Sequence, residues 1–357
     1  GCPAGLELTE ADIQRDLDRR KPGQSMITTS GGEPDEVRIH SGLQDGYTTG
    51  TPLGMVIQNK DARSGKYEPY VTAPRPSHGD FTYSAKFGTR NWGGGGRSSA
   101  RETVNWVAAG AVAKKVLDDH GIELKAHVNQ IGDIEAPDVS FEQMLEHSED
   151  NEVRCAHPET ADRMRERIEQ YQKEGDSIGG SVEFEVRGVP RGLGAPRFDS
   201  MTARLGQAMM SVPAATAFEF GLGREARRYR GSERNEDWEF DEDGDPVPVG
   251  NDHGGIQGGI TTGQPIRGEV TIHAPTSIPK AQTTVDWETG EEKEIQVVGR
   301  HDPVLPPRGV PVVESMLALT LVDFLLLSGR ANPDRMDGRP GKYETDYHPR
   351  SPGNVDE

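Results

Sequence analysis

Apolar residues recur along this chain with two spacings, one typical of helices and one typical of short strands. Near the start, Thr9 and Asp12 form a capping-box-like pattern, and Ile13 and Leu17 then share one helical face. This first helix should end before Pro22. Further helices are predicted over residues 98–120, 159–173, 203–210 and 312–327.

Shorter alternating runs predict strands over residues 36–40, 53–58, 124–131, 181–187 and 270–273. Two of these strands follow similar sequences, GYTTGTPLGMVI at 46–57 and GITTGQPIRGEV at 259–270, which share G-x-T-T-G-x-P and then an apolar residue. Turn chemistry that arose twice by chance explains the similarity, and a diverged duplication explains it equally well. A duplication would give two similar β-α-β units packed together.

The composition indicates a turn-rich globular chain. Of its 357 residues 32% are hydrophobic, and the mean hydropathy of −0.71 is low for a globular enzyme but not as low as in disordered chains. The 44 glycines and 25 prolines lie mostly in loops between the periodic segments. Cys2 and Cys155 provide neither a disulfide framework nor a metal-ligand spacing. No apolar stretch approaches the roughly 20 residues of a membrane helix, and no signal peptide opens the chain, so we expect a cytoplasmic protein.

Charge is strongly unbalanced, with 59 acidic against 40 basic residues and a net charge of −19. Such a surface repels nucleic acids and anionic membranes, so we expect neither as a partner. The acidic excess is concentrated in solvent-like stretches such as 146–152 and 233–245. An acidic, lysine-poor coat suggests a salt-adapted organism. If the chain acts on an anionic substrate, its arginines must be concentrated in one pocket.

Two polar segments have the character of functional sites. Arg300, His301 and Asp302 stand side by side on a predicted loop just before the last apolar helix, and titratable residues at the mouth of a rigid element often carry chemistry. A surface ion pair that caps the helix is the alternative. His78 lies in a loop punctuated by proline and glycine, where an imidazole suits proton transfer near neutral pH; a purely structural histidine is the alternative.

Two glycine-rich segments suggest a bound anion or ring. The glycines at 93–96 lead into RSSAR at 97–101, and glycine-rich backbone that opens a helix beside arginines is typical of an anion site. It is not a Walker motif, because no Gly-Lys-Ser/Thr follows. A plain helix capped by Ser98 or Ser99 explains the hydroxyls but not the glycines and arginines together. The glycines of 254–263 suit close backbone approach to a planar ring or a phosphate.

Six long motifs resemble the chorismate synthase family, and they occur in the family's order across nearly the whole chain. They are RPSHGDFTY (75–83), GGRSSARETVNWVAAGAVAKKVL (95–117), GDSIGGSVEFEVRGVPRGLGAP (175–196), GGIQGGITTGQP (254–265), SIPKAQTTVD (277–286) and GRHDPVLPPRGVPVVESMLAL (299–319). The resemblance implies an α+β fold, a β-α-β sandwich core of two similar halves. It also implies one domain over residues 1–330, followed by a polar, flexible tail at 331–357.

The resemblance further implies a reaction and its partners. The enzyme would be a carbon–oxygen lyase that converts 5-enolpyruvylshikimate 3-phosphate to chorismate and phosphate by anti-1,4 elimination, the last step of the shikimate pathway. Reduced FMN would be required although there is no net redox change. NADPH would serve only indirectly, through a separate flavin reductase, because no G-x-G-x-x-G in a βαβ setting supports a dinucleotide site. The family is expected to form a homotetramer.

The family pattern also assigns roles to residues of this chain. His78 would protonate the reduced flavin, and Asp302 would be the carboxylate near flavin N5. Cofactor contacts would come from Arg97, Ser98, Ser99, Pro213, Ala214, Gly258, His273, Ala274, Pro275, Thr276, Ser277 and Arg300. The substrate would meet Arg20, Arg75, Arg101 and Arg300.

Several positions depart from the family pattern. Met26 stands where a basic residue is expected, Gly31 and Gly32 where charged residues are common, and His273 where lysine is usual. The family also begins with a GESHG segment that this sequence does not contain, so we expect a chain that is truncated at its start, without one catalytic acid and a first core strand. A catalytically impaired flavin- or phosphate-binding protein is therefore the alternative function. An ordinary flavin oxidoreductase is a third.

The charge balance predicts that folding depends on salt. Screening should relieve the self-repulsion of a chain with net charge −19, so the midpoint of thermal unfolding should rise as KCl increases from low to molar concentration. Differential scanning calorimetry measures this directly. A midpoint that does not change with KCl would show that the acidic coat is no adaptation to salt.

Overall fold

The computed structural model describes residues 1–28, 32–60, 64–93, 96–242, 244, 246–297 and 302–329. Arg300, His301, Gly31 and the predicted tail at 331–357 therefore lie outside the described residues.

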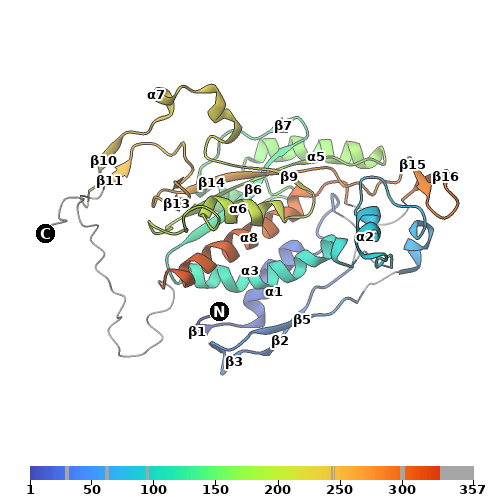
Figure 1. The fold of residues 1–357 in the computed structure, drawn as a ribbon, viewed down its shortest axis with the longest axis horizontal. Helices are drawn as coiled ribbons and strands as arrows, with labels where there is room; N and C mark the ends of the chain where they lie inside the picture. Colours follow the sequence, from blue (N-terminus) through green and yellow to red (C-terminus); the bar gives the residue numbers. More distant parts are fainter. Residues whose placement is uncertain are drawn as a thin grey trace.

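A layer of helices forms the centre of the molecule (Figure 1), built from α1 (Glu10–Arg20), α3 (Thr103–Asp118), α6 (Met201–Met210) and α8 (Pro306–Leu327). The capping box predicted at Thr9 is present, because its hydroxyl and the Asp12 side chain each bond the other's backbone N–H. The start predicted for α3 is wrong. Ser99 caps a short 3-10 turn, η3 (Ala100–Glu102), which follows η2 (Gly96–Ser98), and the α-helix begins only at Thr103.

A five-stranded antiparallel sheet covers this layer on one side, in the order β7-β6-β8-β14-β9. Its strands are β6 (Glu123–Ile131), β7 (Ile134–Glu135), β8 (Gly180–Arg187), β9 (Ala215–Phe220) and β14 (Ile266–Ile272). Alternate residues of β8, namely Val182, Phe184 and Val186, are buried in the core. The predicted strands 124–131 and 181–187 are thereby confirmed. Helices α4 (Phe141–His147) and α5 (Pro158–Lys173) also pack on this sheet.

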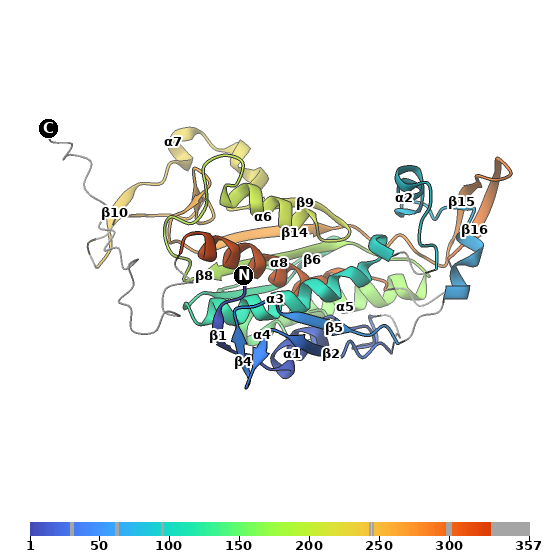
Figure 2. The same cartoon turned by 60° about the horizontal axis from the view of Figure 1, so that its bottom comes forward.

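Smaller sheets lie on the other side of the helices, as both views show (Figures 1 and 2). One pairs β2 (Val37–Ser41) with β5 (Gly54–Ile57), and the other has the order β1-β4-β3, from β1 (Ala4–Glu7), β3 (Leu43–Gln44) and β4 (Tyr47–Thr49). The order sheet, helices, sheet confirms the predicted sandwich of α+β class.

The two halves of the chain follow the same plan. In the first half α1 is followed by β2, then by β3 and by β4, which contains both threonines of the Thr-Thr-Gly motif, and then by β5, which pairs antiparallel with β2. In the second half α6 is followed by β9, then by a longer insertion that ends at the second Thr-Thr-Gly motif, and then by β14, which pairs antiparallel with β9. A second echo precedes each helix, GCPAGL at 1–6 and GVPRGL at 188–193. These correspondences favour duplication over chance.

The remaining elements extend from the two ends of the core. An outer lobe, residues 64–93 and 279–297, contains η1 (Ser64–Tyr70), α2 (Asp80–Phe87) and the hairpin of β15 (Ala281–Asp286) and β16 (Glu291–Gln296). It has a small apolar core of its own, in which Tyr70 and Ala73 contact Ile295 and Val297. At the other end lie η4 (Gly223–Arg228), α7 (Gly231–Arg234), β10 (Trp238–Phe240), β11 (Pro246–Pro248), β12 (Ile256–Gln257) and β13 (Ile260–Thr261).

Helix α8 is longer than the predicted 312–327, because it begins at Pro306. Its length and composition alone would allow it to cross a membrane, so the expectation that no segment reaches that length is wrong. Most of it is buried inside the molecule, however, where it packs along α3 and beneath β6 and β8. The same composition is found in the core helices of other folds.

Glu314 introduces a buried charge into the middle of α8. Its carboxylate accepts hydrogen bonds from Arg19 of α1 at 2.6 and 3.0 Å, from Lys114 of α3 at 2.7 Å and from the backbone N–H of Ala126 in β6 at 3.3 Å. Burial alone would raise the pKa of Glu314, but Arg19 and Lys114 outweigh that effect and hold it well below its usual range. The carboxylate therefore joins three elements to α8.

Removal of this carboxylate should be costly. Glu314→Ala leaves Arg19 and Lys114 partly buried, with Asp16 as the carboxylate they still share, so the free energy of unfolding should fall by about 3 kcal/mol, the lower end of the range for a broken buried pair. Denaturant titration at constant salt measures the loss. Glu294→Ala, on the exposed face of β16, is the matched control and should change stability by less than about 0.5 kcal/mol. Similar losses for the two variants would contradict the role of Glu314.

Candidate functional site

Three arginines from separate parts of the chain converge at the ends of the central helices. We call Arg20, Arg101 and Arg308 the arginine cluster. Arg20 is the last residue of α1 and is only 4% exposed. Its buried guanidinium is satisfied by hydrogen bonds that it donates to Thr103 Oγ1 at 3.0 Å and to the carbonyl of Ala100 at 2.8 Å. Burial, together with repulsion from Arg308 and Arg101, lowers the pKa of Arg20 to about 10. The cluster is therefore a concentration of positive charge in a protein with a negative surface.

Asp35 is the carboxylate that holds two members of the cluster together. It is fully buried and pairs with Arg20 at 3.2 Å and with Arg101 on its other oxygen. Its backbone φ of +50° is unusual for a residue other than glycine. Strained backbone of this kind persists where the surroundings fix it, and it is common at functional sites. Asp35 was not predicted as a site residue, because a single aspartate in a loop gives no indication in the sequence of the arginines it will contact.

A small cavity of about 70 Å³, which we call the site cavity, opens beside the cluster. It brings together both halves of the chain, since Arg20 and Thr103 come from the first half, and Pro213, Ile272 and Asp302 from the second. The predicted residues Arg20, Pro213 and Asp302 therefore do meet. At this volume the cavity can be only the deep end of any larger binding site.

Arg308 also lines the site cavity, and the sequence analysis missed it. Its guanidinium donates to the Asp302 carboxylate and, through Nε at 3.1 Å, to the carbonyl of Arg20. Its position in the sequence could have identified it as a site residue. Arg308 lies in the first turn of a helix, where the helix dipole disfavours a cation. An arginine placed there indicates a nearby carboxylate or an anionic ligand.

His78 lies in the outer lobe, in the loop before α2. Its Nδ1 is 3.0 Å from Arg75 Nη2 and 3.1 Å from Asp80 Oδ1. The loop reaches back to the core, since a Cβ added to Gly79 would lie 3.5 Å from that of Ser98. The predicted His78 and Ser98 are therefore close, and Asp80 is a further residue that sequence reasoning had not singled out.

The predicted cofactor residues form two groups beside the site cavity. In one, Arg97 is largely exposed, with a long ion pair of 3.8 Å to Glu102, and Ser99 caps η3. In the other, the backbone N–H of His273 donates to the carbonyl of Ala214 at 2.9 Å, which joins the 213–214 turn to the loop 273–277 that contains Ala274, Pro275, Thr276 and Ser277. That loop follows Ile272, a residue that lines the cavity.

Gly258 does not join these groups within one chain. It lies in the β12–β13 turn, where the carbonyl of Gly259 accepts from the N–H of Met201 at the start of α6. Pro213 follows the other end of α6, and a helix of ten residues is roughly 15 Å long. The structure thus separates this predicted contact from the other cofactor residues.

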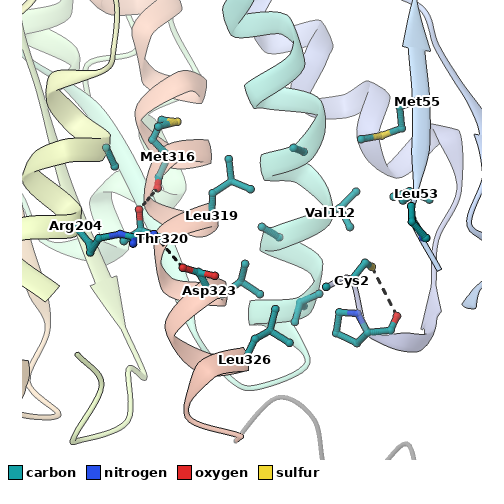
Figure 3. Close-up of a pocket in the computed structure, with 18 of the residues that line it drawn as sticks. Cys2, Leu53, Met55, Val112, Arg204, Met316, Leu319, Thr320, Asp323 and Leu326 are labelled. Atoms are coloured by element: carbon teal, nitrogen blue, oxygen red, sulfur yellow. Dashed lines mark hydrogen bonds and ion pairs between the residues drawn. The ribbon is translucent and has the colours of Figure 1, made fainter. Parts of the chain in front are cut away.

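A larger cavity lies elsewhere. An open groove of about 770 Å³, the apolar groove, is lined by α3, α6 and α8 and by residues 1–3, 50–53 and 55 (Figure 3). Figure 3 shows mostly aliphatic side chains along it, with the ion pair of Arg204 and Asp323, at 3.0 Å, on one wall. None of the predicted site residues lines the groove. An anionic ligand fits the arginine cluster better than this surface.

Comparison with known proteins gives a consistent result. The chorismate synthase family model matches residues 1–326. A chorismate synthase of Haloquadratum walsbyi is 80% identical over 99% of this chain and 92% of its own length. One of Methanosarcina mazei is 50% identical over 95% of this chain and 92% of its own length. A crystal structure of chorismate synthase superposes with a TM-score of 0.72 at 31% identity, covering 92% of this chain and 86% of that one.

The arginine cluster predicts binding of inorganic phosphate. At constant ionic strength, phosphate should raise the midpoint of thermal unfolding, because a ligand that binds only the folded state stabilises it by about 2.7 kcal/mol at 100 times its Kd. Arg308→Gln should reduce this shift. Arg204→Gln, at the apolar groove, should leave it unchanged. Equal shifts in the two variants would place the anion elsewhere.

Proposed function

Because this chain belongs to the chorismate synthase family, we propose that it converts 5-enolpyruvylshikimate 3-phosphate to chorismate and phosphate by anti-1,4 elimination. The observation that carries the proposal is the arginine cluster beside Asp302 in a cavity shared by the two halves. In this reaction a C–O bond to phosphate breaks and a ring C–H is lost, so the site must stabilise an anion and accept a proton.

The arginine cluster supplies the first requirement. Arg20, Arg101 and Arg308 bring three cations together, and within the described residues Asp35 and Asp302 are the carboxylates paired with them. A site with such an excess of positive charge, shielded from water, favours the charge that develops on a departing phosphate. The family pattern adds Arg75 and Arg300 as substrate contacts.

Asp302 supplies the second requirement. It lines the site cavity from the loop before α8, and the guanidinium of Arg308 holds its carboxylate in place. A carboxylate fixed beside the substrate is suited to proton transfer. His78 is the second proposed proton-transfer group, on the side of the cofactor residues near Ser98.

The cofactor of this reaction is reduced FMN, which supplies electron density when bound. The residues present fit it chemically. Arg97 is exposed and able to meet a phosphate, Thr276 and Ser277 offer hydroxyls, and Ala214, with a positive φ of 68°, follows the cavity-lining Pro213. His273 replaces the usual lysine, and its Nδ1 hydrogen-bonds the carbonyl of Ala274 at 2.6 Å. An imidazole should hold the phosphate less firmly than the permanently charged ammonium group of lysine.

The remaining parts of the proposal concern the protein's surroundings. We propose that it acts in the cytoplasm as a homotetramer and receives reduced FMN from a separate flavin reductase, so that NADPH is used only indirectly. The similarity to relatives from halophilic archaea agrees with the acidic coat.

A catalytically impaired flavin- or phosphate-binding protein is the second candidate function. The observation that favours it is Met26, which is largely exposed at a position where a basic residue is usual.

The substitution Asp302→Asn tests the proposal. It keeps the size of the side chain but removes the charge, so turnover should fall by roughly 10²–10⁴-fold while substrate binding changes little. Anaerobic assays with reduced FMN and 5-enolpyruvylshikimate 3-phosphate measure both quantities, and thermal unfolding is measured on the same preparation. If Asp302 serves only to pair with Arg308, stability should fall while turnover per folded molecule stays intact. That outcome would end its catalytic assignment.

A further inference from the structure

The outer lobe contains a buried charge cluster that the proposed mechanism does not use. Asp80, the first residue of α2, is only 2% exposed. Its two oxygens accept the backbone N–H of Arg75 at 3.0 Å and the Nε and Nη2 of the same arginine at 2.8 and 2.9 Å. Arg90 Nη1 lies 3.4 Å from the same carboxylate. The loop is folded around this one side chain, helped by a positive φ of 56° at Ser77.

Two groups of opposite charge compete for one nitrogen of His78. Arg75 can only donate a hydrogen bond, so its contact requires a bare Nδ1; Asp80, when ionised, can only accept, so its contact requires Nδ1–H. Burial alone would raise the pKa of Asp80, but hydrogen bonds from Arg75 and His78 outweigh that effect and keep it well below its usual range. The carboxylate is therefore an acceptor at any ordinary pH.

We propose that Asp80 is a positioning residue that takes the Nδ1–H of His78 and so leaves Nε2 as the ring nitrogen that exchanges protons. Within the described residues both hydrogen-bonding contacts of this ring use Nδ1, so Nε2 is the position from which it reaches a ligand. The hydrogen bond made by one ring nitrogen sets the tautomer and hence the reactivity of the other. The catalytic part of this inference rests on the proposed function of His78, whereas the tautomer does not.

Arg75 then acts through Asp80. Its guanidinium is 5.7 Å from the ring centre of Tyr67 and 5.8 Å from that of Tyr70, and its Nε, Nη2 and backbone N–H are all directed at Asp80. Arg75 is buried, and its contacts with Asp80 and the two tyrosine rings hold it in one position. Its role is therefore to stabilise the conformation of the loop. This assigns it a different task from the substrate contact that the family pattern implies.

The tautomer of His78 matters for the proposed reaction because the loop that contains it lies next to the predicted cofactor residues. Gly79, next to His78, lies against Ser98 in the segment predicted to contact the cofactor. A ring held by Asp80 would be fixed in orientation at the boundary between the lobe and the site. Without Asp80, Arg75 would be the remaining partner at Nδ1, and the proton would move to Nε2.

The test combines Asp80→Asn with ¹⁵N NMR of the histidine rings, in protein labelled at its 10 histidines and assigned with His78→Gln. The neutral ring of the unmodified protein should be protonated at Nδ1, and that of Asp80→Asn at Nε2. Turnover in the variant should fall by roughly 10²–10⁴-fold with little change in the KM for substrate, because a wrong tautomer impairs proton transfer and not binding.

Two further variants keep the proposal falsifiable if Asp80→Asn folds poorly. Tyr70→Phe removes the hydroxyl that bonds the Gln296 carbonyl at 3.0 Å, so it loosens the lobe without a change at His78, and its tautomer should stay as it was. Arg75→Met removes the competing donor, so Nδ1 should stay protonated. A proton on Nε2 in this variant would show that Arg75 is needed to hold the tautomer and would overturn the role of Asp80.

The outcomes separate the two claims. If the ring keeps its proton on Nδ1 both in Asp80→Asn and in Asp80→Ala, whose side chain offers no acceptor, Asp80 does not set the tautomer and the inference is wrong. If the proton moves but turnover matches that of the unmodified protein, His78 is not the proton-transfer group, and its proposed catalytic role fails while the hydrogen bond stands.

Discussion

The carboxylate of Glu314 is the interaction on which the rest of this structure depends most. It places a full charge inside the apolar helix layer, which is tolerable only because Arg19, Lys114 and a backbone N–H of β6 meet it there. The partners belong to three elements, so the network fixes how α1, α3 and the sheet pack against α8. Arg20 follows Arg19 directly, about 100° further round the helix. Once the end of α1 is fixed at Glu314, Arg20 is directed into the candidate site.

The site also depends on the relation between the two halves. Helices α3 and α8 occupy corresponding positions and cross closely, because a Cβ added to Gly110 would lie 2.2 Å from that of Ser315. Arg101 stands just before α3 and Arg308 in the first turn of α8, so each half contributes one arginine at the start of its core helix. The site cavity lies between these two helix starts. Their N-terminal dipole ends add to the positive charge there, which suits an anion bound across the boundary between the halves.

Periodicity and turn chemistry were enough to predict α1, α5, β6 and β8, because each buries one regular face that is visible in the local sequence. The start of α3 was wrong because Ser99 satisfies the requirement for a cap while capping a 3-10 turn. The ion partners could not be predicted at all. Arg19 and Glu314 are 295 residues apart, and Arg101 and Asp35 are 66 apart, so their pairing follows from the fold and leaves no local pattern.

Salt screens the charges on the surface of this protein much more strongly than the charges in its interior. This difference allows an acidic chain to keep a cationic site. Exposed charges are screened within about 3 Å at molar ionic strength, so the net charge of −19 has little effect there beyond solubility. Buried pairs such as Arg20 with Asp35 and Arg75 with Asp80 are screened much less, since counter-ions cannot approach them. In each pair the carboxylate fixes the position of a cation, and among the described residues the cations of the arginine cluster outnumber the carboxylates paired with them. The excess charge of the site therefore persists at salt concentrations that cancel the charge of the surface.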